Sequence, residues 1–148
     1  MPNIILTRID NRLIHGQVAT QWSGAIGINL ILVANDEVAS NPMRQGLMDM
    51  AAPSYAGTRY WTIEKTINNI HRASDAQKIF IIVDNPQDVL KLVVGNMHMS
   101  EGKRQVATSV AIDDADAEAF RKLRDLGVEI FIQRTPDIAK EDPEVLFK

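Results

Sequence analysis

The sequence predicts an α/β fold with a mainly parallel, open sheet that carries helices on both faces. Short apolar runs alternate along the chain with stretches of helical spacing, which is the pattern of repeated βαβ units. Some of these runs are continuously apolar, as parallel strands are when helices cover both faces of their sheet. The 148 residues contain no repeat, low-complexity tract or linker, so we expect one domain over residues 1–148.

Six apolar segments are predicted to be strands. Lys78–Val83 is the strongest, because β-branched and aromatic residues dominate it. Polar or turn-forming residues follow most of the six, which marks the ends of the strands. The predicted strands cover residues 4–6, 29–34, 58–62, 78–83, 106–112 and 128–133.

The predicted helices lie between these strands. Asn41-Pro42 and Asn85-Pro86 each place a capping side chain before a proline in the first turn. Apolar residues then recur three and four positions apart, as on the buried face of a helix. The expected helices run from Gly16 towards Ala25, from Pro42 to just before Pro53, and through the apolar sets Ile63/Ile67/Ile70, Val89/Leu90/Val93 and Ala117/Phe120/Leu123.

The helix after Pro42 carries apolar side chains at helical spacing, and we expect this methionine-rich stripe to pack in the core. Its members are Met43, Leu47, Met50 and Ala51. Three segments are interpreted as loop or irregular chain: residues 35–37, residues 95–105 and the tail from residue 136.

The composition excludes several functional classes. A net charge of -3 and a pI of about 5.6 argue against a nucleic-acid-binding protein, which usually has a basic face. No apolar run reaches the length of a membrane span, and the first residues do not form a signal peptide. The absence of cysteine excludes disulfides and thiolate metal sites, and the three histidines lack ligand spacing. We therefore expect a cytoplasmic protein with no metal, no nucleic acid and no direct membrane insertion.

The strongest functional signal lies in residues 7–17, which follow the first apolar run and lead into a helical pattern. We interpret this segment as a loop at the carboxyl end of a buried strand, where ligands bind in open α/β sheets. His15 can accept a phosphoryl group, because a neutral imidazole is a competent nucleophile near pH 7. Arg8 and Arg12 supply guanidinium groups, which match phosphate oxygens. Asp10 can bond one ring nitrogen of the histidine and leave the other free to attack.

Gly16 and Gln17 add backbone N–H donors and a favourable dipole, because they open the following helix. The alternative is a polar helix start beside a surface ion cluster, but two arginines and an aspartate in one segment favour the phosphate site. His71 and His98 have no evident chemical role. The chain lacks the glycine-rich loops of nucleotide-binding proteins and the G-x-S-x-G motif, so no cofactor is expected.

Residues 8–18, Arg-Ile-Asp-Asn-Arg-Leu-Ile-His-Gly-Gln-Val, resemble the signature of a known family. This family is the enzyme IIB component of the mannose/fructose/sorbose class of the bacterial phosphoenolpyruvate-dependent sugar phosphotransferase system. The resemblance covers nearly the whole chain. Supporting matches are residues 35–39, 50–53, 95–97, 102–103 and 127–129.

The resemblance implies a three-layer α/β/α domain with an open, twisted sheet, and a phosphocarrier function. His15 would accept a phosphoryl group on Nδ1 from a phosphohistidine of the IIA component. It would then pass the group to a sugar held by the membrane components IIC and IID. Asp10, Arg12 and Arg8 would be its phosphate-handling neighbours. Members often associate as dimers, so a homodimer is a further expectation that no residue pattern here requires.

Residues 62–68 and 95–103 resemble the branch specific for N-acetylgalactosamine or galactosamine. One departure concerns the chain after Val93, where relatives carry a longer segment with a short strand. Here the chain runs directly into Gly95, which leaves the number and order of strands after Val94 open.

Transfer between two histidines requires an accessible acceptor, so we expect a shallow site with an apolar docking rim. Ile14, Trp22 and Met97 are the candidates for this rim, and packing in the core is the alternative for each. Two rival functions stay open on the residues alone. One is a non-enzymatic α/β domain that binds a phosphorylated metabolite through the same segment. The other is a phosphatase-like hydrolase, which is disfavoured because Ile14 stands where an Arg-His-Gly motif would have its arginine.

Overall fold

A computed structural model describes residues 3–74, 76–95, 105–108, 114–133, 136, 140–141 and 143–147. Within these residues, six strands form one sheet in the order β3-β2-β4-β1-β5-β6, and every neighbouring pair is parallel. The strands are β1 Asn3–Ile9, β2 Leu30–Ala34, β3 Gly57–Trp61, β4 Lys78–Val83, β5 Gln105–Thr108 and β6 Glu129–Ile132. The helices are α1 Gly16–Ile26, α2 Asp36–Ala39, α3 Pro42–Ala51, α4 Ile63–Asn69, α5 Pro86–Gly95 and α6 Asp114–Asp125, with short 3-10 turns η1 Ile70–Arg72 and η2 Pro143–Phe147.

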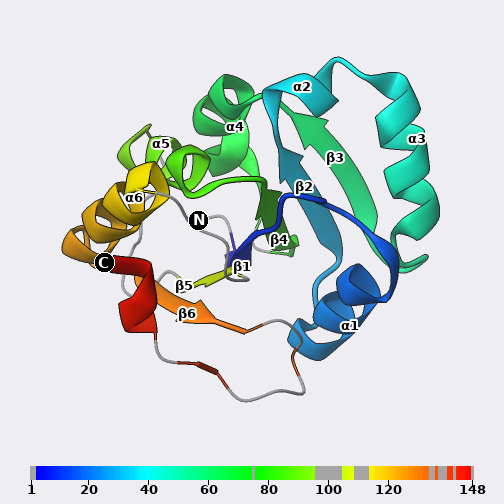
Figure 1. The fold of residues 1–148 in the computed structure, drawn as a ribbon. Coiled ribbons are helices and arrows are strands. Elements are labelled where there is room, and N and C mark those ends of the chain that lie inside the picture. Colours follow the sequence, from blue (N-terminus) through cyan, green and yellow to red (C-terminus); the bar gives the residue numbers. More distant parts are fainter. Residues whose placement is uncertain are drawn as a thin grey trace.

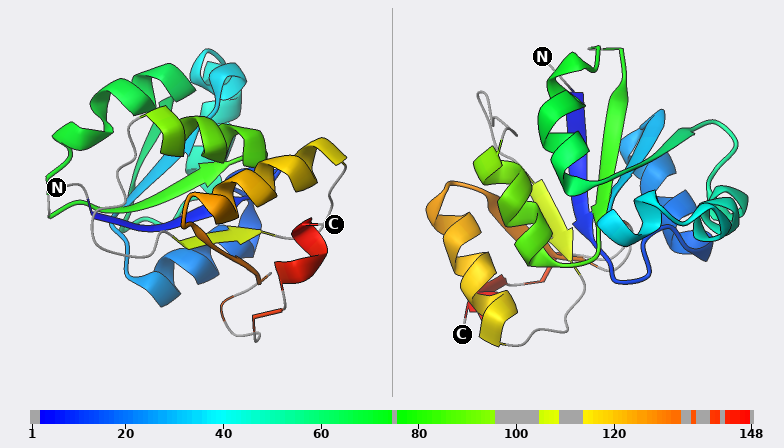
Figure 2. Two further views of the ribbon diagram at one scale, coloured as in Figure 1. Left: turned by 90° about the vertical axis from the view of Figure 1, so that its left-hand side faces the viewer. Right: turned by 90° about the horizontal axis from the view of Figure 1, so that it is seen from above.

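Helices cover both faces of the sheet, which confirms the predicted fold class (Figure 1). α1, α2 and α3 lie on one face, and α4, α5 and α6 lie on the other (Figure 2). This distribution follows from strand order, because right-handed crossovers that run in opposite directions along a sheet place their helices on opposite faces. None of the helices in the described ranges is both long and apolar enough to cross a bilayer.

The sheet is buried on both sides at β4. Phe80 and Ile82 pack with α1, α2 and α3, whereas Ile79, Ile81 and Val83 pack with α4, α5 and α6. Alternate residues of a strand face opposite sides, so an unbroken apolar run is what a strand between two helical layers requires. The prediction of a strand over 78–83 is confirmed.

Two local predictions are wrong. β1 continues through Ile9, so Thr7 and Arg8 belong to the strand and not to the loop after it. Residues 36–39 form the one-turn helix α2 where a polar loop was expected, because the Asn35 side chain accepts a hydrogen bond from the Val38 N–H over 3.0 Å.

The interpretation of the methionine stripe is also wrong. Met43 is 79% exposed and Met50 is 84% exposed, and Leu47 is exposed as well. α3 instead turns Met48 towards the sheet, and only Ala51 of the expected stripe packs against that core. Residues 109–112 of the predicted fifth strand, and 96–104 of the predicted surface loop, lie outside the described residues.

Candidate functional site

The candidate site lies at the carboxyl end of β1, where the connections of two neighbouring strands diverge. β1 continues into α1 on one face of the sheet, whereas β4 continues into α5 on the opposite face (Figure 1). The Asp10 N–H donates to the Val83 carbonyl over 2.8 Å and so joins the two strand ends. In open α/β sheets such a divergence creates the crevice in which ligands bind.

Leu13 turns the chain between Asp10 and His15. Its N–H donates to the Asp10 carbonyl over 3.0 Å, and its φ of 60° lies in the left-handed region that leucine rarely adopts. That conformation costs about 1–2 kcal/mol. Burial of the Leu13 side chain in the core under α1 offsets the cost and holds the turn in place.

Asp10 is buried and organises this turn. Its Oδ2 lies 2.9 Å from Nε2 of His15, and its Oδ1 accepts a hydrogen bond from the Arg12 N–H over 3.0 Å. An ionised carboxylate can only accept, so the hydrogen of this His15 bond belongs on Nε2. The other ring nitrogen, Nδ1, then has its lone pair available for attack on phosphorus.

Arg8 is buried beneath the turn, on β1. Its guanidinium donates to the Gln133 carbonyl over 2.8 Å and lies 5.0 Å from the centre of the Trp22 ring. Its Nε is 3.7 Å from Oδ2 of Asp10, which makes an ion pair. Burial lowers the pKa of Arg8 from its usual value, and the attraction of Asp10 opposes that change. Arg8 therefore contacts the Asp10 carboxylate from the buried side, away from solvent.

Arg12 has a different position. Its side chain is 68% exposed, and its Nε lies 3.8 Å from Oδ1 of Asp10. The guanidinium is thus anchored at the site yet accessible to a phosphate that approaches from solvent. An arginine fork suits phosphate oxygens in this arrangement.

His15 occupies the N-cap position of α1, and Gly16 and Gln17 are the first two residues of the helix. The N–H groups of a first turn have no partners within the helix, and the dipole favours an anion there. No acidic residue lies in that turn to compete with a bound phosphate. The His15 side chain is 21% exposed, so the imidazole is accessible at one edge.

The predicted docking rim is wrong for two of its three residues. Ile14 and Trp22 are both buried and pack in the core under α1, so neither can contact a partner. Met97 lies outside the described residues. Both buried residues pack beneath the site. Ile14 follows the turn at Leu13, and Trp22 lies against the Arg8 guanidinium.

Gln133 is a site residue that the sequence reasoning missed, because its contribution is a backbone carbonyl. A signal was present nonetheless, since Gln133 ends the last predicted strand, and carboxyl ends of parallel strands meet at one edge.

A second polar cluster lies along the same edge, at the ends of β2 and β4. The Asn35 side chain donates to Oδ2 of Asp84 over 3.0 Å, and the Asn85 side chain donates to Oδ1 of Asp84. Burial, followed by repulsion from Asp84, raises the pKa of Asp88 to about 6. No group of His, Cys, Asp and Glu side chains in the described part of the chain could hold a metal ion.

Comparison with known proteins identifies close relatives. The family described as "PTS system sorbose subfamily IIB component" matches residues 4–148. The N-acetylgalactosamine-specific phosphotransferase enzyme IIB component 2 of Escherichia coli is 51% identical over 146 residues, which cover 92% of this chain and 93% of that protein. The crystal structure of IIB component 1 from Escherichia coli has a TM-score of 0.86 at 42% identity, over 95% of this chain and 99% of the other. An N-acetylgalactosamine IIB component from Streptococcus pyogenes has a TM-score of 0.86 at 33% identity, over 98% of each chain.

Proposed function

Because the chain belongs to the sorbose subfamily of IIB components, the phosphotransferase components of a sugar uptake system, we propose that His15 carries its phosphoryl group. The observation that supports this assignment is the 2.9 Å contact between Nε2 of His15 and Asp10. The contact occupies one ring nitrogen and leaves Nδ1 as the nucleophile. His15 thus combines partial exposure, an oriented imidazole and a neighbouring guanidinium.

Two transfers follow from this assignment. In the first, Nδ1 of His15 forms an N–P bond while the N–P bond of a phosphohistidine on the IIA component breaks. In the second, a sugar hydroxyl oxygen takes the phosphoryl group and loses its proton, and the electrons of the N–P bond return to Nδ1. Phosphoryl transfer depends mainly on positioning and charge stabilisation, which this site can supply.

The neighbouring residues have distinct roles. Arg12 and the N–H groups of Gly16 and Gln17 bind the phosphoryl oxygens, because the Arg12 side chain is exposed beside Asp10 and the two N–H groups belong to the first turn of α1, directly after His15. Asp10 keeps the hydrogen on Nε2. Arg8 is a positioning residue that acts through Asp10, since its buried guanidinium lies behind the carboxylate.

We assign N-acetylgalactosamine as the sugar, because the relative at 51% identity and two solved structures are named for it. The sugar would be held by IIC and IID components in the membrane, and this chain would supply the phosphoryl group to it.

The test is phosphorylation of the full chain with phosphoenolpyruvate, enzyme I, HPr and a matching IIA component. Intact mass is expected to rise by one phosphoryl group, and peptide mapping to place an acid-labile adduct on His15. The variant His15→Ala should remain unmodified. His71→Ala is the matched control, because His71 is exposed on η1, away from the sheet edge that carries His15, and its loss should leave the adduct intact.

Asp10→Asn tests the role of the carboxylate. Loss of the charge that orients Nε2 is expected to slow phosphoryl transfer by about 10–100-fold, while the adduct stays on His15. An adduct on His15→Ala would exclude His15 as the carrier. Saturable binding of a phosphorylated metabolite, with no adduct from several active IIA components, would favour the ligand-binding alternative.

A further inference from the structure

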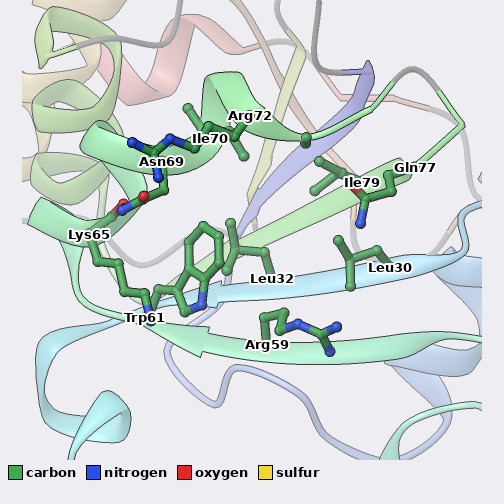
Figure 3. A pocket seen from close by; sticks show the side chains of 11 residues that line it. Leu30, Leu32, Arg59, Trp61, Lys65, Asn69, Ile70, Arg72, Gln77 and Ile79 are labelled. Carbon is green, nitrogen blue, oxygen red and sulfur yellow. The ribbon is translucent and has the colours of Figure 1, made fainter.

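A cavity of about 230 Å³ lies between the sheet and the helical segment α4–η1, on the face of the sheet opposite α1. Figure 3 shows the side chains that line it. Its walls come from β2, β3 and β4 below and from α4 and η1 above. It contains none of the residues proposed to carry or bind the phosphoryl group. Its volume is below that of pockets for drug-sized ligands, so its ligand must be small.

The cavity exists because α4 and η1 leave part of the sheet uncovered. α4 spans only 7 residues. At the edge strand β3, alternate side chains face opposite sides: Thr58 and Tyr60 bond Asp49 of α3, whereas Arg59 and Trp61 line the cavity. The edge strand thus turns an aromatic ring and a cation towards a space that no helix fills.

The floor of the cavity is apolar. On the sheet, Leu32 and Ile79 are buried and Leu30 and Trp61 are half-buried, and the buried Ile70 of η1 adds an apolar side chain from above. In Figure 3 the Trp61 ring stands between Lys65 and Leu32, so an apolar body that enters the cavity would contact the ring and the leucine together. Such a surface favours a flat or branched hydrocarbon group.

The rim of the cavity is cationic. Arg59, Lys65 and Arg72 line it together with the amides of Asn69 and Gln77, and none of the described residues of the lining carries a carboxylate. Nζ of Lys65 lies 5.2 Å from the centre of the Trp61 ring, and Arg59 donates to the carbonyl of its neighbour Thr58 over 2.7 Å. Ion pairs to other described residues engage none of these three cations. Three positive charges gather here although the whole chain carries -3.

We propose that this cavity binds a small organic anion that combines an apolar, preferably aromatic, body with one oxyanion group. The body packs on Leu32, Ile79 and Trp61, and the oxyanion accepts hydrogen bonds from Arg59 and Lys65 at the rim. Both the charge and the apolar body of the ligand matter. A neutral aromatic molecule would form no ion pair with the cations at the rim, and a simple inorganic anion would leave the apolar floor in contact with water.

The experiment compares two molecules of nearly equal shape, 1-naphthoate and the neutral 1-naphthamide. Each is titrated into the ¹⁵N-labelled full chain, and the indole N–H signal of Trp61, assigned with Trp61→Phe, is followed by NMR. Naphthoate should shift this signal saturably, together with amides of β2 and β3. Naphthamide should bind about tenfold more weakly, because it makes no charge-assisted hydrogen bond.

Variants that each remove one positive charge test which residues of the rim bind the anion. Arg59→Gln and Lys65→Gln should each weaken naphthoate binding about fivefold and leave naphthamide binding unchanged, since both side chains are exposed and the apolar floor stays intact. Lys122→Gln removes an exposed lysine of α6, outside the cavity, and is the matched control.

Three results would overturn the proposal: no saturable shift of Trp61 with naphthoate, equal affinity for the two probes, or equal loss of affinity in Lys122→Gln. A shift map centred on residues 10–17 would likewise assign the anion to the phosphoryl site. Each outcome leaves the phosphocarrier assignment of His15 intact, because that assignment is measured by the covalent adduct.

Discussion

Asp10 shows how much of the candidate site depends on one buried side chain. Both carboxylate oxygens are used: Oδ2 by the His15 ring and Oδ1 by the Arg12 N–H. The sequence was sufficient to name Asp10 as the partner of His15, because both residues lie in one short segment. It did not show which ring nitrogen is bonded, because that depends on the left-handed turn at Leu13.

The position of Arg8 could not be predicted from the residues around it in the sequence. The sequence placed Arg8 in the loop, as a phosphate-binding neighbour of His15. The structure buries it on β1, against Trp22 and the carbonyl of Gln133. Those contacts come from distant parts of the chain, so no local pattern contains them.

Asp88 provides a prediction at the same scale. Its pKa is about 6 in the folded protein against 3.8 for the free side chain, so the folded chain binds more protons between these values. The contribution of Asp88 to the stability of the fold is therefore fully present below about pH 4, and it is lost as the pH rises through about 6. Asp88→Asn should raise the stability at pH 8 by about 1–2 kcal/mol, a figure already reduced for solvent screening, and flatten this part of the profile.

Thermal unfolding of wild type and Asp88→Asn between pH 4 and pH 8 would measure this difference. Glu118→Gln, a change of an exposed carboxylate on α6, is the control and should follow the wild-type profile. Parallel profiles for wild type and Asp88→Asn would show that Asp88 ionises normally in the folded chain.

At the scale of elements, periodicity located most helices and strands but did not determine which face a helix buries. α3 has apolar residues on more than one side, and the largest set, Met43, Leu47 and Met50, faces solvent. Pairing of Thr58 and Tyr60 with Asp49 helps to set its rotation, and this information lies in β3. α2 was missed because a single turn is too short to display a period.

Two glycines in helices are expected to respond oppositely to alanine. A Cβ on Gly46 of α3 would meet no atom within 4 Å, whereas a Cβ on Gly95 of α5 would lie 2.7 Å from the Ile67 side chain. Gly46→Ala should stabilise the protein by about 0.5–1 kcal/mol, because alanine restricts the unfolded chain. Gly95→Ala should destabilise it by about 1–3 kcal/mol, because α4 and α5 must separate.

Urea denaturation of the two variants, compared with wild type, measures both effects, and each variant controls for the other. If Gly95→Ala were stabilising, the Ile67 side chain would be able to move aside without a loss of stability.

At the scale of the whole molecule, the alternation of strands and helices was sufficient to predict a parallel sheet covered on both faces. The order of the strands was not predicted, because the positions of crossovers depend on how helices pack across the finished sheet. The cavity under α4 was missed for the same reason. It depends on a helix that is too short for its sheet, and residues from three strands are needed to outline it.

Strand order predicts a gradient of stability across the sheet. β4 lies between two neighbours and is almost completely buried, whereas β3 is an edge strand with exposed residues. Native-state hydrogen exchange should therefore be slowest for the amides of β4 and clearly faster for those of β3. Equal protection of both strands would indicate that the sheet opens only as a whole, or that another chain covers the β3 edge.

The central place of β1 affects how the protein is made. Its sheet neighbours, β4 and β5, have not been synthesised when β1 leaves the ribosome. The carbonyl that pairs with Arg8 follows 125 residues later, which at about 5–20 residues per second is about 6–25 s of translation. During that interval the apolar segment of β1 and the Arg8 guanidinium are not yet enclosed by the later parts of the chain. The residues of the phosphoryl site are among the first to be translated, and their geometry is among the last to be completed.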